Sequence, residues 1–202
     1  AIHTLTRDSV EKIAFLEGHG ELGEREVFDL SQALSRYYQI DRGSLGNETD
    51  ILNDYRVVII ADPQEPFSEK DKYILDQYLM QGGRILWVVN GVRFSDDYLS
   101  QSGMTPVIPL DLKIDDMLFR YGVRINATLV QDLQCLPVPV DVSNNPQQPN
   151  WQPMPWTYAP LLLTSHASPI TRNLMQVSST MASTIEFVGG EDGIQKEVLL
   201  AT

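Results

Sequence analysis

The chain has 202 residues, 43% of them hydrophobic and 21% charged, a composition that is typical of one folded globular domain and argues against disordered, collagen-like and fibrous proteins. Its 27 acidic and 15 basic residues give a formal net charge of -12, which argues against nucleic acid and anionic lipid surfaces as partners, because both repel an acidic protein. The single cysteine, Cys135, excludes an intramolecular disulfide and a cysteine-rich zinc site.

The first predicted elements are a strand, a tight turn and a helix. Residues 12–16 form a short apolar run that predicts a buried strand. Gly18 and Gly20 follow it directly and allow a sharp turn. Apolar residues then recur at spacings of three and four, which predicts an amphipathic helix over about residues 23–38.

A second strand, a second helix and a third strand come next. After Arg56, the strand predicted over residues 56–61 is apolar and rich in β-branched side chains, as expected for a central parallel strand that is covered on both faces. Ser68 and Asp71 have the spacing of a capping box, which predicts a helix start, and Gly82 predicts the helix end. The apolar run at residues 85–89 predicts another parallel strand. Together these elements predict a doubly wound α/β fold with a mostly parallel sheet.

The remainder of the chain is predicted to extend this sheet. We expect a third helix over residues 114–121, and then short strands at 123–125 and 128–131. A proline-rich segment follows and predicts a long loop. Further strands are expected at residues 159–164, 177–188 and 197–201, the middle one long and broken by a bulge or bend. We therefore predict a single domain over residues 1–202, made of a doubly wound core (1–135), a proline-rich loop (136–160) and an extended C-terminal β region (161–202).

A candidate ligand site lies at the predicted carboxyl edge of the sheet. Loops that follow parallel strands meet at this edge, where doubly wound folds bind their ligands. Negative charge on the turn disfavours a phosphate group there. In an alternative interpretation the glycines only shape the turn, one acidic side chain complements the helix dipole, and the histidine is exposed. The residues that we expect to line the crevice are Gly18, His19, Gly20, Glu21, Asp62 and Asn90.

The sequence does not contain the motif of a nucleophilic enzyme. A hydrolase or amidotransferase on such a sheet needs a serine or cysteine on a glycine-flanked elbow, with a histidine nearby. Cys135 has no flanking glycine, and we interpret it as a packing residue. The three histidines, His3, His19 and His166, lack the spacing of metal ligands. We therefore predict no catalytic residue, no metal site and no cofactor.

An aromatic cluster within the proline-rich segment is a second candidate binding surface. Trp151, Trp156 and Tyr158 offer broad apolar rings with one polar group each, which suits stacking on a sugar or contact with a partner protein. In the alternative interpretation these rings pin the loop onto the domain. Both interpretations stay open, and we count Trp156 and Tyr158 among the candidate binding residues.

Several short motifs follow one another along nearly the whole chain. They are Phe-Leu-Glu-Gly-His-Gly-Glu at 15–21, Val-Ile-Ile-Ala-Asp-Pro at 58–63, Phe-Ser-Glu at 67–69, Gly-Gly-Arg-Ile-Leu-Trp at 82–87, Leu-Phe-Arg-Tyr-Gly-Val at 118–123, Leu-Val-Gln-Asp at 129–132, Trp-Thr-Tyr-Ala-Pro at 156–160 and Ser-Pro-Ile-Thr at 168–171. In this order they resemble the GldG family of ABC-transporter auxiliary proteins, which is tied to gliding motility.

This resemblance implies a fold, a location and partners. The fold would be the class I glutamine amidotransferase-like, flavodoxin-like sheet without its catalytic cysteine. The location would be the periplasmic, extracytoplasmic face of the bacterial inner membrane, beside a permease and an ATPase that are separate chains. Because the longest apolar runs are far shorter than the ~20 residues that span a bilayer, we expect this sequence to be excised from a longer chain that carries the membrane anchors.

The leading functional interpretation is a non-catalytic auxiliary domain, for binding or scaffolding, of a bacterial ABC transporter associated with gliding motility. Its expected partners are the permease and ATPase subunits, with a small ligand or a sugar as a further candidate. One alternative is an enzyme of the amidotransferase-like or hydrolase type, and another is a carbohydrate-binding module. The sequence of the neighbouring segments would separate these interpretations, since flanking apolar helices favour the transporter.

Overall fold

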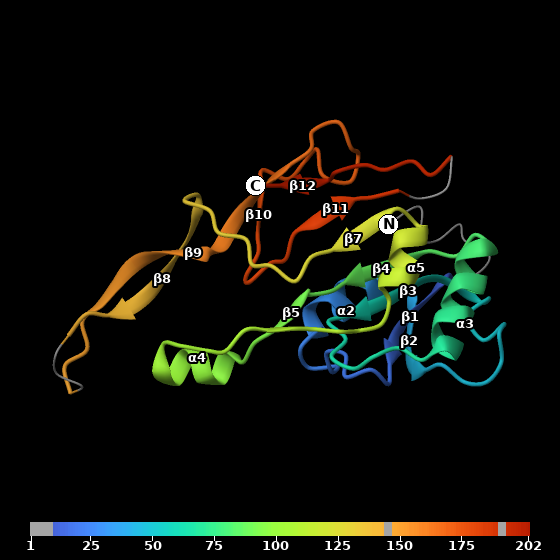
Figure 1. Cartoon of the computed structure of the whole chain (residues 1–202), viewed down its shortest axis with the longest axis horizontal. Coiled ribbons are helices and arrows are strands. Elements are labelled where there is room, and N and C mark those ends of the chain that lie inside the picture. The colour runs from blue at the N-terminus through green and yellow to red at the C-terminus, as the bar shows by residue number, and fades with distance from the viewer. Residues whose placement is uncertain (1–9, 144–146, 190–192) are drawn as a thin grey trace. The chain divides into compact units, whose positions relative to one another are not determined.

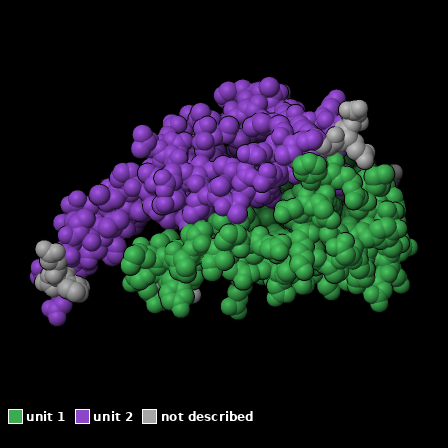
Figure 2. Space-filling view, viewed as in Figure 1, with its two compact units in different colours: residues 1–120 green, residues 121–202 purple. Residues whose placement is uncertain are grey.

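A computed structural model describes residues 10–143, 147–189 and 193–202. The chain divides into two compact units, residues 1–120 and 121–202, which Figure 2 shows in different colours. The division falls after Arg120, whereas we predicted a core that continues to residue 135. Each unit is described by itself below.

The N-terminal unit contains a four-stranded parallel sheet (Figure 1). All adjacent strands are parallel, in the order β2-β1-β3-β4. The three predicted strands of this sheet are confirmed, but β2 was not predicted, because its sequence is polar apart from Ile40 and carries no buried-strand pattern. The strands are β1 (Lys12–Glu17), β2 (Gln39–Ser44), β3 (Tyr55–Ala61) and β4 (Ile85–Val88).

Two helices cover the faces of this sheet. Helix α2 (Phe28–Ser35) is shorter than predicted, because the backbone at Gly23 forms a turn that Glu26 closes through both its main chain and its carboxylate. Helix α3 (Glu69–Met80) begins at the predicted capping box, and Gln81 is its C-cap, just before the predicted glycine. Among the described residues, no helix has the length and hydropathy needed to cross a membrane.

The period-two alternation of the strands gives the sheet two apolar faces. One face packs against α2, and its buried cluster consists of Ile13, Phe15, Val27, Ile59 and Ala61. On the other face lie Val58 and Ile60, both completely buried. Helix α3 contributes its own buried residues, Ile74, Leu75 and Tyr78.

Short elements complete the N-terminal unit. Strands β5 (Val92–Arg93) and β6 (Ile108–Pro109) form a small antiparallel ladder, with α4 (Asp96–Ser102) between them in sequence. The third predicted helix is present as α5 (Asp115–Arg120), and the chain leaves it through Gly122, which has a φ of 78°.

The proline-rich segment is a β-hairpin, so the prediction of a loop over residues 136–160 is wrong. Strand β8 (Cys135–Asp141) pairs with the first part of β9 (Trp151–Thr164). Its prolines face one another, as the pairs Pro137–Pro155 and Pro139–Pro153. Proline cannot donate to a ladder, but these pairs occupy positions that need no inter-strand N–H. Pairing between two proline-containing strands therefore leaves the ladder intact.

The other C-terminal strands do not extend the parallel sheet, contrary to our prediction. Strands β10 (Gln176–Ser178) and β12 (Leu200–Ala201) pair antiparallel with β9. Strand β7 (Val123–Ile125) pairs with β11 (Ile185–Phe187). The strand at 177–188 is interrupted near Met181, whose φ is 53°, which agrees with the expected break. Residues 128–131 form no strand, contrary to our prediction.

Candidate functional site

The predicted turn after β1 is confirmed, and it closes the place where a ligand crevice was expected. Helices α2 and α3 lie on opposite sides of the sheet (Figure 1), so the loops after β1 and β3 diverge, which opens a crevice in other doubly wound folds. Here the loops are bonded together. The backbone N–H groups of Gln64 and Glu65 donate to the His19 carbonyl at 2.7 and 2.8 Å.

The glycines of the turn make this closure possible. Gly18 and Gly20 have φ values of 115° and 72°, in the region that glycine enters without steric cost. A Cβ atom on Gly20 would lie 3.1 Å from the Cβ of Gln64. The crevice between the two loops is therefore filled by the chain itself at this point.

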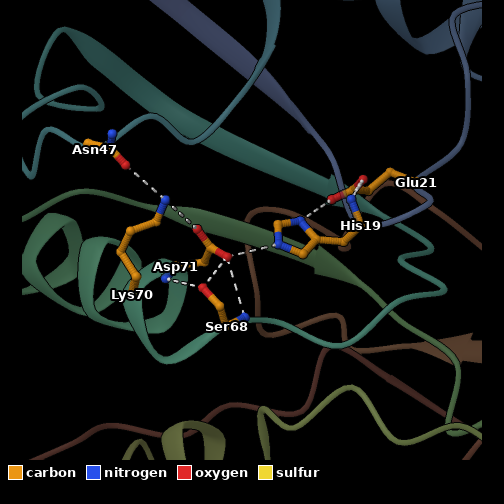
Figure 3. Close-up of polar contacts among 6 residues, drawn as sticks. All are labelled: His19, Glu21, Asn47, Ser68, Lys70 and Asp71. Carbon is orange, nitrogen blue, oxygen red and sulfur yellow. Dashed lines mark hydrogen bonds and ion pairs between the residues drawn. The ribbon is translucent and has the colours of Figure 1, made fainter.

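His19 is buried, which corrects the expectation that it is exposed. Its relative exposure is 7%, and its ring stacks on Phe67 with 3.8 Å between the centroids and 13° between the planes. Nδ1 lies 3.1 Å from Oε1 of Glu21, and Nε2 lies 3.4 Å from Oδ2 of Asp71 (Figure 3). The backbone N–H of His19 donates to the other Glu21 oxygen at 2.7 Å. The imidazole thus links the turn after β1 to the first turn of α3.

The electrostatics of this cluster favour an imidazolium between two carboxylates. Burial alone lowers the pKa of His19, but hydrogen bonds and charge from Glu21 and then Asp71 outweigh burial and raise it. Burial raises the pKa of both carboxyl groups, but hydrogen bonds outweigh this effect. Hydrogen bonds with His19 hold the pKa of Glu21 below its usual value. Hydrogen bonds with Ser68, and then with His19, hold the pKa of Asp71 below its usual value.

The order of hydrogen bonds differs from that of a catalytic triad. The Ser68 hydroxyl donates to Oδ2 of Asp71 at 2.5 Å, and the Asp71 backbone N–H donates back to Ser68 Oγ at 3.2 Å. A nucleophilic serine would instead donate to the imidazole, which would take up its proton. In Figure 3 the carboxylate of Asp71 lies between Ser68 and His19. The arrangement stabilises a helix start and a turn, and it does not activate the hydroxyl.

Asp62 and Asn90 form a second polar contact at the carboxyl edge of the sheet, where we expected both residues but not a bond between them. The Asn90 side-chain amide donates to Oδ1 of Asp62 at 3.0 Å. Asp62 has a φ of 51°, in the left-handed region that aspartate and asparagine tolerate best among non-glycine residues. Burial raises the pKa of Asp62; the hydrogen bonds from Asn90 and Gln64 oppose this rise, and the charge of Glu26 adds to it.

Asp62→Asn should keep or raise stability at neutral pH. Asparagine retains an oxygen for Asn90 and tolerates the positive φ, but it carries no charge to desolvate. Because the folded-state pKa of Asp62 is raised, wild-type stability falls as pH rises through that value. The gain of the variant should therefore be present at pH 7 and absent below the ordinary value of 3.8, as measured by urea unfolding. If Asp62→Asn is less stable than wild type at pH 7, burial of the charged Asp62 carboxylate does not destabilise the fold.

The aromatic candidates belong to the other unit. Trp156 and Tyr158 lie two residues apart on β9, between the pairs Pro137–Pro155 and Cys135–Pro160 where the strand register shifts, and both are half-buried. The remaining candidates belong to the N-terminal unit. The two candidate surfaces predicted from the sequence therefore belong to different units of the chain.

Sequence reasoning missed Phe67, Asp71 and Arg42 as members of the carboxyl-edge cluster. The capping box already placed Asp71 in the first turn of a crossover helix, and such helices begin at the carboxyl edge of the sheet. That signal was sufficient to expect Asp71 near His19. Arg42 on β2 donates to Oε1 of Glu17 at 2.7 Å and to the Leu22 carbonyl at 3.0 Å, and the polar sequence of β2 gave no sign of it.

A cavity lies at the opposite, amino-terminal edge of the sheet. Its volume is about 620 Å³, and it opens near the start of β1, the start of β3 and the end of α3. Charges of both signs line it, and Glu11 pairs with Arg56 at 3.5 Å. Among the described residues, no group of three or more histidine, cysteine, aspartate or glutamate side chains is arranged to hold a metal ion.

Comparison with known proteins supports the transporter interpretation at the level of the family. No curated protein matches the chain. A solved structure described as the mmIFT52 N-terminal domain is similar in fold, with a TM-score of 0.59 and 17% identity over 88% of this chain and 69% of that chain. Residues 11–202 match the family described as ABC-type uncharacterized transport system. Since this match covers almost the whole sequence, the chain belongs to the ABC-type uncharacterized transport system family of auxiliary components.

Proposed function

We propose that this chain is a non-catalytic binding or scaffolding domain of a bacterial ABC transporter of the gliding-motility type, located on the periplasmic face of the inner membrane. Membership of the transport family supports the transporter role. The ordered motifs shared with GldG-type proteins support the finer assignment to gliding motility. Its partners are the permease and ATPase subunits of that transporter.

The closed carboxyl edge is the observation that carries the non-catalytic part of the proposal. Both ring nitrogens of His19 face carboxylates, and its carbonyl accepts two backbone hydrogen bonds. A general base needs a free nitrogen within reach of a substrate. Cys135 begins β8 in the other unit, where it takes part in a strand pair with Pro160. Neither residue has the arrangement of an activated nucleophile or base.

The strand order supports a common fold with the amidotransferase-like proteins. Flavodoxin-like sheets have the order 2-1-3-4-5, and the parallel sheet here has the order β2-β1-β3-β4. A shared fold carries no chemistry by itself. We propose that this chain retains the sheet of that class and uses it as a rigid support for contacts with other proteins.

The full-length tagged protein should co-purify with the permease and ATPase subunits from detergent-solubilised membranes, since an auxiliary component functions in contact with the transporter. Co-purification is measured by quantitative mass spectrometry, with an unrelated inner-membrane protein of similar abundance as the control. Recovery of the tagged protein without either subunit would sink the proposal. Rapid stoichiometric labelling of Cys135 by a thiol probe, with loss of a measurable turnover, would replace it with an enzyme.

A further inference from the structure

The hairpin of β8 and β9 exposes apolar side chains in the C-terminal unit. Trp151, Met154 and Val140 have relative exposures of 62%, 45% and 41%. Figure 1 shows the hairpin extending away from the other strands of its own unit. A two-stranded hairpin is marginal by itself in water, and a group of exposed apolar side chains marks an interaction surface.

The register divides these side chains between two faces. Val138 pairs with Met154 and Val140 pairs with Gln152, so these four residues lie on one face. We call Val138, Val140 and Met154 the valine face. The opposite face carries the two proline pairs and the pair of Asp141 with Trp151.

The prolines exclude recognition through the strand edges. At the pairs Pro137–Pro155 and Pro139–Pro153, the backbone nitrogens point outward and carry no hydrogen. Partners that add a strand to a sheet edge depend on such outward N–H groups. Each edge of the hairpin has lost two of them. A partner of this hairpin is therefore recognised by side chains.

The segment around the hairpin is almost uncharged, although the chain has a net charge of -12. Between Leu133 and Thr171 the single formally charged side chain is Asp141. Its Oδ1 accepts hydrogen bonds from the backbone N–H groups of Ser143 at 2.9 Å and Asn150 at 2.8 Å. This carboxylate closes the end of the hairpin. The valine face itself has no charge, which suits an uncharged apolar surface on the partner.

A lipid bilayer and a second copy of the chain fit this surface less well. The connection between the strands, residues 142–150, is rich in asparagine and glutamine, whose amide groups are costly to transfer into hydrocarbon. Two copies would bring net charges of -12 against one another. A partner protein of the same transport system avoids both costs.

We propose that the valine face is the surface by which this chain binds an uncharged apolar surface of another protein of its transport system. This proposal rests on the proposed function, and it names the surface that performs it. The partner contacts this face of the hairpin and not the strand edges, and Val140 and Met154 lie near the centre of the contact. Because such contacts exclude water from apolar groups, a charge placed within the face should disrupt them strongly.

The test compares two variants of the full-length tagged protein in membranes that contain the permease and ATPase. The double variant Val140→Glu, Met154→Glu should reduce co-purified permease at least about 10-fold. Trp151→Ser removes a larger exposed side chain from the opposite face of the same hairpin and should leave co-purification within about two-fold. Both variants should keep a Tm within about 2 °C of wild type, because all three sites are exposed.

A photo-crosslinking amino acid supplies the second measurement. At position 140 it should crosslink to a transporter subunit, and at position 151 it should not. If wild type co-purifies and the double variant does so equally, this inference fails while the proposed function stands. If wild type does not co-purify, the proposed function fails. A wild-type dimer, or binding to phosphatidylcholine vesicles, that the double variant abolishes would overturn the proposal in favour of a second copy or a membrane.

Discussion

Replacing His19 with alanine should lower the free energy of unfolding by about 3 kcal/mol at mildly acidic pH. The imidazole faces Glu21, whose side chain is 2% exposed, and Asp71, whose side chain is 15% exposed. Removing one partner of a buried ion pair leaves the remaining charge buried without compensation. The resulting loss of stability exceeds the net stabilisation that the intact pair provides. Alanine also removes the ring that stacks on Phe67. The loss is measured by urea unfolding of purified protein.

The loss should depend on pH with a defined sign. The folded-state pKa of His19 is raised above 6.5, so its contribution is fully present below 6.5 and is lost as pH rises through the folded value. The pKa values of Glu21 and Asp71 are lowered from 4.5 and 3.8, so their contributions are present above those values and are lost as pH falls through the folded values. The difference between wild type and variant should thus be largest between 4.5 and 6.5.

His166→Ala is the matched control for this prediction. His166 is exposed, so its replacement should change stability by less than about 0.5 kcal/mol at any of these pH values. In a double-mutant cycle, His19→Ala and Glu21→Gln should be non-additive, because the two side chains are in direct contact. If the difference in free energy of unfolding between wild type and His19→Ala stays the same between about pH 5.5 and pH 9, the charged imidazolium contributes nothing to stability.

Phe67→Ala should lower the free energy of unfolding by about 4 kcal/mol, as large-to-small changes at buried aromatic positions do. Phe67 is 1% exposed, stacks on His19 and meets Trp87 edge-on with 5.6 Å between the centroids. Its removal leaves a cavity beside both rings. Tryptophan fluorescence and far-UV circular dichroism, followed through a urea titration, measure the change in the free energy of unfolding. The m-value should stay that of wild type.

Phe119→Ala is the control for the size of the side chain. Phe119 is 54% exposed, so the same substitution there should cost less than about 0.5 kcal/mol. Phe67→Leu keeps part of the apolar volume, so its free energy of unfolding should lie between those of wild type and Phe67→Ala. A loss of less than about 1 kcal/mol in Phe67→Ala would mean that the cluster around His19 collapses into the cavity without penalty.

Local patterns were sufficient to predict the centre of the N-terminal unit. The runs that became β1, β3 and β4 are apolar on both pleat faces, which is the signature of covered parallel strands. The capping box of Ser68 and Asp71 involves residues three positions apart, so it is visible without any tertiary information. The positive φ of Gly20 is likewise a local property of a turn.

Long-range contacts produced the features that the sequence alone did not reveal. His19 and Asp71 are 52 positions apart, and only the parallel pairing of β1 with β3 brings the turn and the helix start together. This pairing buries the imidazole, which the alternative interpretation of the turn left exposed. The prolines of β8 and β9 predicted a loop, because proline disfavours strands. In the hairpin Pro137 pairs with Pro155 and Pro139 pairs with Pro153, at positions where the ladder needs no N–H donor, so the prolines cost no hydrogen bond. No pattern within either strand specifies which strand it pairs with.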